Sequence, residues 1–203
     1  MSKGLKTTLI IIGVLVVFLI GGCSYYSNTY NKMITLDESV SGAWAQVQNV
    51  YQRRYDLIPN LVETVKGYAA HESQVYADIA EARSKAGGVI QLSARDLEDP
   101  AVLEQFQAAQ ASLSGALQRL LAVTENYPEL KADQNFLALQ DQLEGTENRI
   151  TVERGRFNEA VTAYNTYIRS FPNNIIANMS GFRVKEKFAA DVAAQSAPVV
   201  SFD

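Results

Sequence analysis

Few residues in this sequence have side chains that could carry out chemistry, and they lie far apart. The chain of 203 residues contains one cysteine, Cys23, and one histidine, His71. Cys23 follows a long apolar segment, whereas His71 lies in a stretch with helical spacing, which argues against a pair of nucleophile and base. One cysteine and one histidine also cannot build the usual kind of zinc site. Because the carboxylates are scattered over helical faces, we expect no catalytic residue, no metal ion and no cofactor.

The surroundings of Cys23 indicate a different chemistry, the attachment of lipid. Two lysines precede an apolar stretch from Leu9 to Ile20, and Ile20-Gly21-Gly22-Cys23 follows it. This order of a basic region, an apolar region and small residues is typical of a signal sequence. Under this hypothesis residues 1–22 are a lipoprotein signal, and Cys23 becomes the lipidated first residue of the mature protein.

The same segment also fits a retained transmembrane helix. No charged residue lies between Thr7 and Tyr30, and Leu5 to Tyr25 is long enough to span about 30 Å of hydrocarbon as a helix. Three tyrosines, Tyr25, Tyr26 and Tyr30, would then lie at the level of an interfacial aromatic belt. Both hypotheses tether the rest of the chain to a membrane. The basic N-terminus predicts that this rest lies on the non-cytoplasmic side, after a single-pass N-terminal anchor.

An adjacent pair of arginines, Arg53 and Arg54, is the second candidate for recognition chemistry. Guanidinium groups bind carboxylates and phosphates through paired hydrogen bonds, so the pair could hold a partner protein or a lipid headgroup. The alternative is structural: Arg54 lies on the apolar side of the helix and would pair with a carboxylate on a neighbouring helix. Glu72 has the same two interpretations, and an isolated helical His71 is more often solvated than a pH sensor.

Composition limits the class of protein. After the anchor about 170 residues remain, enough for one domain with its own core. The net charge is −4, with 18 basic and 22 acidic residues, so no basic excess indicates nucleic-acid binding.

Apolar spacing predicts an all-α fold, with an N-terminal transmembrane helix followed by an antiparallel bundle of three or four long helices. From Val40 to Ala86 one register of three and four positions continues without a slip, even across Pro59, and Arg54 and Glu72 are its only strongly polar members. We therefore expect a helix over residues 36–86 that is ended by Gly87-Gly88, with either a kink or a short break between two collinear halves at Pro59. If it is continuous, this helix is about 75 Å long.

Two further helices are expected near residues 100–126 and 133–171. Asp99-Pro100 is a favourable start for the first of them. In the second, six apolar residues are spaced seven apart, which is coiled-coil spacing and fits a bundle core, and we expect the first four of them to face that core. These residues are Phe136, Leu143, Ile150, Phe157, Tyr164 and Phe171. The expected domains are therefore an anchor over residues 1–30, a helical bundle over 31–175 and a partly flexible tail over 176–203.

Several segments resemble the LemA family. They are Tyr51-Gln52-Arg53-Arg54-Tyr55-Asp56-Leu57-Ile58-Pro59-Asn60-Leu61-Val62, the following Glu63–Ala69, then Tyr127–Ala132, Leu143–Ile150 and Phe171–Asn174. The resemblance covers about residues 30–190 and implies a bacterial protein with an N-terminal membrane segment and long antiparallel helices. It implies no reaction, because the family has no established catalytic activity. Cys23 departs from a plain anchor, which leaves lipidation open.

The candidate interaction motif comprises eight residues of the first of these segments: Tyr51, Arg53, Arg54, Tyr55, Leu57, Ile58, Pro59 and Asn60. The leading hypothesis for function is a membrane-tethered scaffold that is not an enzyme, self-associates beside the bilayer and docks an unidentified protein partner, with no nucleic acid. The alternative is an envelope sensor or adaptor that couples to a partner protease or kinase. A single apolar segment favours the scaffold, because a sensor needs a ligand pocket or a second span.

Overall fold

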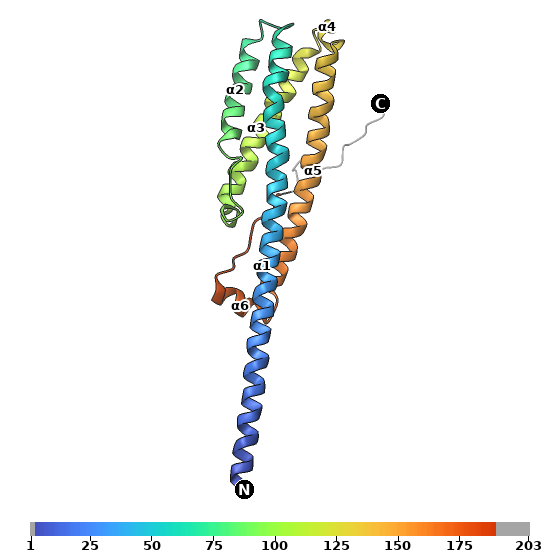
Figure 1. Ribbon diagram of the computed structural model, residues 1–203. Helices are drawn as coiled ribbons and strands as arrows, with labels where there is room; N and C mark the ends of the chain where they lie inside the picture. The colour runs from blue at the N-terminus through green and yellow to red at the C-terminus, as the bar shows by residue number, and fades with distance from the viewer. Residues whose placement is uncertain (1–2, 190–203) are drawn as a thin grey trace, which may run out of the picture.

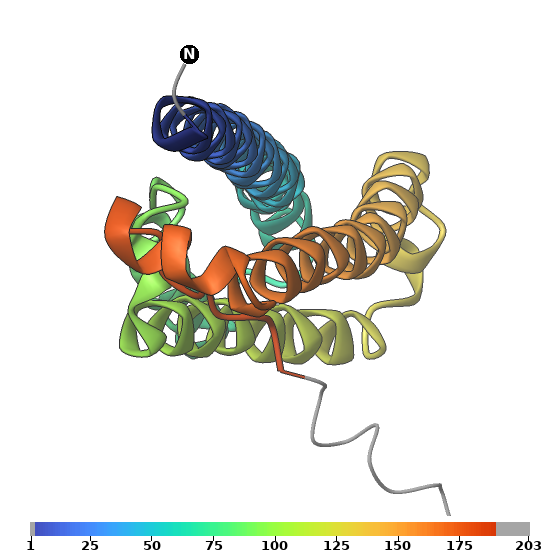
Figure 2. The ribbon, with the colours of Figure 1, turned by 90° about the horizontal axis from the view of Figure 1, so that it is seen from below.

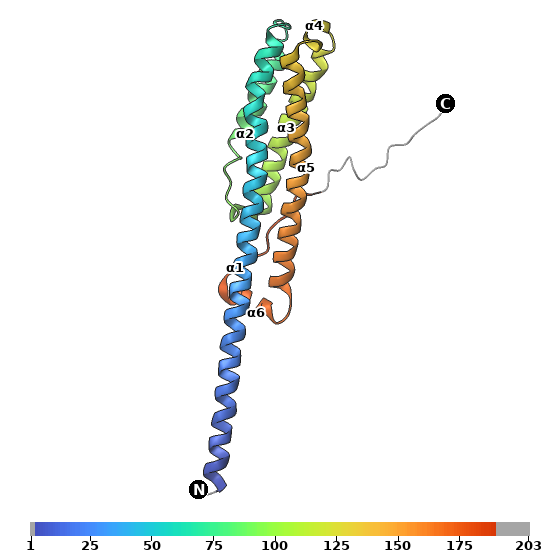
Figure 3. The same ribbon diagram turned by 45° about the vertical axis from the view of Figure 1, so that its right-hand side comes forward.

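The computed structural model describes residues 3–189, and all of its regular elements are helices (Figure 1). They are α1 (Lys3–Lys66), α2 (Ser73–Gly87), the short 3-10 helix η1 (Asp96–Glu98), α3 (Pro100–Thr124), α4 (Pro128–Lys131), α5 (Gln134–Arg169) and α6 (Asn173–Ser180). The upper part of α1 with α2, α3 and α5 forms an antiparallel bundle, in which successive long helices run in opposite directions (Figures 1 and 3). This arrangement confirms the all-α prediction.

Helix α1 is one uninterrupted helix that carries both the apolar segment and a core-facing seam. Its side chains from Leu9 to Ile20 stand away from the bundle and are exposed, and this part of the helix is long and apolar enough to cross a membrane. Pro59 has no N–H to donate to the carbonyl of Tyr55. The helix nevertheless continues past it to Lys66, as the unbroken spacing predicted.

The prediction that the first helix extends to residue 86 is wrong. Helix α1 ends at Lys66, and α2 runs back down beside it from Ser73 (Figure 1). The amides of Tyr68 and Ala69 both donate to the carbonyl of Val65, which closes the end of α1. The apolar spacing persists because Val65 and Ala69 are buried on one side of the turn and α2 buries Ile79 on the other. The spacing of three or four residues between apolar side chains therefore continued by coincidence through the turn between α1 and α2.

Helices α3 and α5 lie close to where the sequence placed them. The carboxylates of Asp99 and Asp133 cap them, accepting from the amides of Ala101 and Phe136 respectively, each at 2.9 Å. Such capping satisfies an amide that has no partner within its own helix. Both predicted starts are therefore correct to within a residue or two.

Five of the six heptad residues on α5 face the core, and the sixth does not. Phe136, Leu143, Ile150, Phe157 and Tyr164 are at most 6% exposed. Phe171 is 82% exposed, so the seven-residue spacing extends one residue beyond the core-facing part of α5. Helix α5 ends at Arg169, and a residue that precedes proline is disfavoured in helical conformation, so Phe171 no longer follows the heptad.

The core divides into two clusters along the bundle. The lower core in Figure 1 centres on an aromatic group of Trp44, Phe106, Phe157 and Phe188, whose ring centroids lie 5.3–6.2 Å apart. The upper core is mainly aliphatic and includes Ile58, Leu61, Leu117 and Leu120. A polar layer around Arg54 lies between the two.

The chain after α5 remains packed against the bundle up to the last described residue. Helix α6 lies against α1 at the lower end of the bundle, and Gly181 ends it with a φ of +78°, a conformation that glycine adopts without steric cost. Residues 182–189, which we call the strap, then run in extended form along α5. Ile176, Ala177, Lys185 and Phe188 are buried. The expected boundary at residue 176 thus falls within packed structure, and residues 190–203 of the expected tail lie outside the described part of the chain.

Candidate interaction site

The predicted interaction motif is divided between two faces of α1. Tyr51, Arg54 and Ile58 are buried, Tyr55, Leu57 and Pro59 are half-buried, and Arg53 and Asn60 are exposed. Because an external partner can reach only the exposed side chains, the motif is not one continuous surface. Most of it packs within the bundle.

Arg54 occupies the polar layer and lies only 2% exposed. Its Nη1 donates to Glu147 Oε1 on α5 and to Ser114 Oγ on α3, each at 2.9 Å, and its Nη2 donates to Gln110 Oε1 at 2.5 Å. One side chain therefore joins three helices, and the structural alternative for Arg54 is the one observed. Two buried N–H groups of this layer, Arg54 Nε and Gln110 Nε2, have no partner among the described protein atoms.

Tyr55 packs against α2. The guanidinium of Arg83 on α2 lies 4.0 Å from the centre of its ring, within the range of a cation–π interaction. A side chain at Gly87 would meet the same ring at 3.1 Å, so glycine permits the close approach of α2 to α1. Arg53 and Asn60 are therefore the motif residues best placed to meet a partner.

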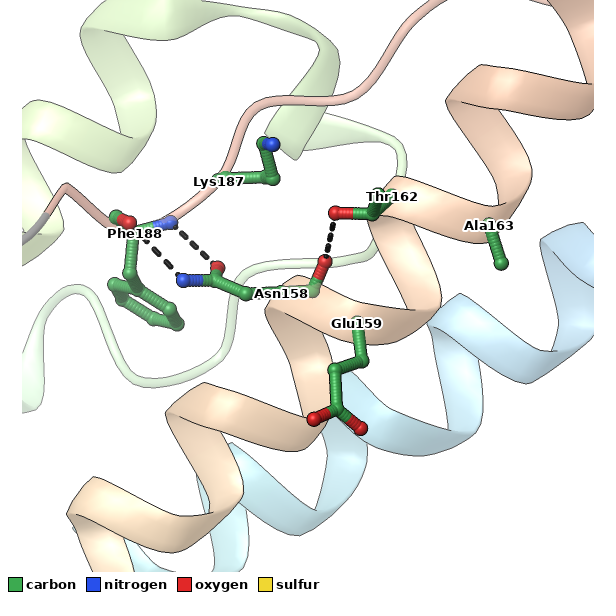
Figure 4. Close-up of a pocket in the computed structure, with 6 residues that line it drawn as sticks. All are labelled: Asn158, Glu159, Thr162, Ala163, Lys187 and Phe188. Atoms are coloured by element: carbon green, nitrogen blue, oxygen red, sulfur yellow. Dashed lines mark hydrogen bonds between the residues drawn. The ribbon is translucent and has the colours of Figure 1, made fainter.

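Sequence analysis did not identify the site where α5 holds the strap (Figure 4). Asn158 donates its amide to the carbonyl of Phe188 at 3.1 Å and accepts from the Phe188 amide at 2.9 Å. Asn165 makes the same pair of bonds with Lys185, at 2.8 and 3.0 Å. Because the two asparagines are seven residues apart, they lie on one face of α5. This spacing was visible in the sequence, but nothing there named the segment that they would bind.

Two strap side chains, those of Lys185 and Phe188, are buried in the bundle. The Lys185 ammonium is 1% exposed and lies 3.0 Å from Asp37 Oδ1, 3.9 Å from Glu98 Oε1 and 3.3 Å from the Ala94 carbonyl. Burial raises the pKa of the neighbouring Tyr164, and the carboxylates of Asp37 and Glu98 raise it further. The strap thus connects α1, the loop around η1 and α5.

A surface hollow of about 480 Å³ lies between α5 and the strap and is lined by Asn158, Glu159, Thr162, Ala163, Lys187 and Phe188 (Figure 4). In Figure 4 the Asn158 side chain points toward the Phe188 backbone, and Thr162 donates to the Asn158 carbonyl. The polar groups here bind backbone, and no set of nucleophile, base and orienting group occurs in this hollow. The arrangement is suited to holding an extended peptide.

The remaining candidate residues lie apart from these sites. Cys23 is exposed on the lower part of α1 with an unbridged thiol, and His71 is exposed in the turn between α1 and α2. Glu72 is half-buried and accepts a long hydrogen bond of 3.4 Å from the Tyr127 hydroxyl. Across residues 3–189 no three side chains of His, Cys, Asp or Glu come together as a metal site would require.

Comparison with known proteins identifies relatives over most of the chain. The model of the LemA family matches residues 43–202. Magnetosome protein MamQ 2 of Paramagnetospirillum magneticum is 26% identical over 191 residues, which cover 85% of this chain and 68% of the relative. Magnetosome protein MamQ of Magnetospirillum gryphiswaldense is 26% identical over 78% of this chain and 64% of its own length. Protein LemA of Metamycoplasma hominis is 25% identical over 82% of this chain and 74% of its own length.

Proposed function

This chain belongs to the LemA family, and from that premise we propose that it is a membrane-tethered helical scaffold that self-associates beside the bilayer. In this proposal the anchor determines where the protein works, and the bundle presents surfaces to other copies and to a protein partner. The proposal includes no catalytic step. The excess of lysines before the apolar segment supports placing the bundle on the non-cytoplasmic side.

The continuity of α1 is the observation that supports this proposal most directly. One helix from Lys3 to Lys66 holds the apolar segment at one end and the polar layer of the bundle at the other. A flexible linker would let the bundle move freely, whereas a continuous helix holds it at a fixed height and angle to the segment below. A fixed presentation of this kind suits a protein whose task is to position others.

The aromatic residues of α1 and α5 are poor candidates for lateral contact between copies. Trp44, Tyr51 and Tyr164 are at most 4% exposed, and Tyr55 and Tyr167 are half-buried. These rings pack within the bundle. The outward stripe of α1 consists instead of small or polar residues, among them Gly42, Ala45, Asn49, Gln52 and Asp56. Contacts through this stripe would be weak, but a shared membrane raises the local concentration at which they act.

Cysteine crosslinking in native membranes tests self-association. The variants carry Ala45→Cys or Asn49→Cys on the outward stripe of α1, in a Cys23→Ser background. Ala80→Cys on the exposed face of α2 is the control, because it matches the others in exposure but lies on a different helix. We expect disulfide-linked dimers from the α1 positions and fewer from the control. Monomer alone at native expression levels, from every position, would rule out self-association and favour the sensor or adaptor.

A further inference from the structure

Helix α6 exposes apolar side chains that the bundle does not cover. Ile175 is 52% exposed and Met179 is 76% exposed, and Phe171 just before the helix is 82% exposed. They are spaced four residues apart, so Ile175 and Met179 lie side by side on one face of α6. The opposite side of the helix is occupied, because Ile176 and Ala177 are buried against the bundle. We call Phe171, Ile175 and Met179 the α6 stripe.

The position of α6 along α1 shows what lies next to this stripe. The Tyr25 hydroxyl donates to Asn173 Oδ1 at 2.7 Å, and the Tyr26 hydroxyl lies 3.3 Å from Ser180 Oγ. Asn173 and Ser180 are the two ends of α6, whereas Tyr25 and Tyr26 differ in height by only about 1.5 Å on α1. Helix α6 therefore lies crosswise to α1, as Figures 1 and 2 show at the lower end of the bundle.

This level coincides with the end of the apolar segment. From Leu5 to Tyr25 the helix rises about 30 Å, which matches the hydrocarbon thickness of a bilayer. Tyr25 and Tyr26 would thus lie at the boundary between hydrocarbon and headgroups. If instead Cys23 is lipidated, the boundary falls two residues from Tyr25, so α6 lies at the membrane surface under either form of anchor.

We infer that α6 is a second membrane contact, with its apolar stripe seated in the headgroup region of the leaflet next to the bundle. The inference rests on the proposed membrane tether and adds to it a site that binds lipid. Interfacial helices lie in the membrane plane with their apolar face about 5–10 Å deep. The crosswise direction of α6 and its stripe meet that requirement. Exposed Lys32, Arg169 and Arg183 lie close to α6 in the chain or on the adjacent part of α1 and suit the anionic phosphates of lipids.

The consequence is control of orientation. A single span allows the apolar segment and the bundle to tilt together in any direction relative to the bilayer. A second contact on one side of that span restricts the tilt, and the hydrogen bonds from Tyr25 and Tyr26 fix that side relative to α1.

Depth-dependent quenching on the full-length protein tests the inference. The protein carries Cys23→Ser and one new cysteine labelled with an environment-sensitive fluorophore, in vesicles of phosphatidylcholine and phosphatidylglycerol. Met179→Cys reports on the stripe, and Val17→Cys reports on the apolar segment. Val152→Cys is the matched control, because Val152 is 51% exposed on α5 but about 25 Å along that helix from its lower end. Spin-labelled lipids carry the quencher either near the headgroup or near the chain end.

We expect the label at residue 179 to shift to shorter emission wavelength and to be quenched by the headgroup-proximal spin label. The label at residue 17 should be quenched by the deep spin label, and the label at residue 152 by neither. Changing Ile175→Gln together with Phe171→Gln should reduce quenching at residue 179 toward the control value. Both side chains are exposed, so the thermal midpoint should not change.

Three other quenching patterns would contradict the inference, each for a different reason. If residue 17 is quenched but residue 179 behaves like residue 152, the tether stands and α6 is not a membrane contact. If the emission at residue 179 shifts without lipid quenching, a protein surface such as a second copy covers the stripe, and the inference is wrong. If residue 17 is not quenched, the membrane tether itself is refuted and the inference falls with it.

Discussion

Removing the carboxylate of Glu147 should destabilise the bundle, because Arg54 would remain buried without its counter-ion. Arg54 is 2% exposed and the Glu147 side chain is 42% exposed, with 2.9 Å between the charged atoms. Breaking a fully buried pair costs about 3–5 kcal/mol, whereas an exposed pair contributes about 0–1 kcal/mol. Glu147 reaches solvent, and Arg54 keeps its bonds to Gln110 and Ser114. We therefore expect Glu147→Ala to lower the free energy of unfolding by about 2 kcal/mol.

The conservative change separates charge from hydrogen bonding. Glu147→Gln keeps an acceptor near Arg54 but removes the negative charge. A charge-assisted bond is about twice as strong as a neutral one, so we expect a loss of about 1 kcal/mol. Glu144→Ala is the control, because Glu144 is exposed one helical turn away on α5 and should change stability by less than about 0.5 kcal/mol.

Thermal unfolding followed by circular dichroism in detergent micelles measures these differences. For a protein of this size 1 kcal/mol shifts the melting temperature by about 2–4 °C. Glu147→Ala should thus lower it by about 4–8 °C and Glu147→Gln by about half as much. A melting temperature for Glu147→Ala equal to that of Glu144→Ala would show that Gln110, Ser114 and solvent suffice to hold the Arg54 charge.

Three further predictions concern the burial or exposure of single side chains, and a fourth concerns the anchor. Leu143→Ala should cost about 2–5 kcal/mol of unfolding free energy because Leu143 is buried in the upper core, whereas Phe171→Ala should leave the melting temperature in detergent unchanged. Burial raises the pKa of Tyr164, so the stability it confers is complete below pH 10, the ordinary tyrosine value, and declines as pH rises above it. Tyr164→Phe should reduce the fall of the melting temperature with rising pH above pH 10. An equal fall in the variant would show that other groups cause it. The intact mass distinguishes the anchors: a mature chain that starts at a diacylated Cys23 rejects the retained span, and a full-length chain rejects lipidation.

Helices α3 and α5 could be predicted because their signals are local. Asp99 and Asp133 supply capping carboxylates, and the apolar heptad of α5 continues for four turns or more without interruption. The passage of α1 through Pro59 agrees with the unbroken apolar spacing, although the same spacing also continues through the turn after Lys66. These features depend on residues within a few positions of one another.

The parts that were missed depend on contacts between distant residues or on a coincidence of spacing. Lys66 followed by Gly67 is a helix-ending signal, but the apolar register continued past it and concealed the reversal before α2. The strap has no periodic pattern of its own. Lys185 and Phe188 are buried because α5 places Asn158 and Asn165 opposite their backbone, which no local pattern in residues 182–189 reveals.

The unbroken length of α1 also fixes an angle. Each residue of an α-helix turns the chain by about 100° and advances it by about 1.5 Å, so the side of the apolar segment that carries Cys23 has a set azimuth relative to the outward stripe of the bundle. Two copies that meet through their apolar segments would therefore bring the same faces of their bundles toward each other. Inserting one alanine between Asn31 and Lys32 would rotate that relation by about 100°, whereas inserting seven residues would nearly restore it, with an offset of about 20°. In such a dimer, pairing inside the membrane would select which faces of the two bundles meet outside it.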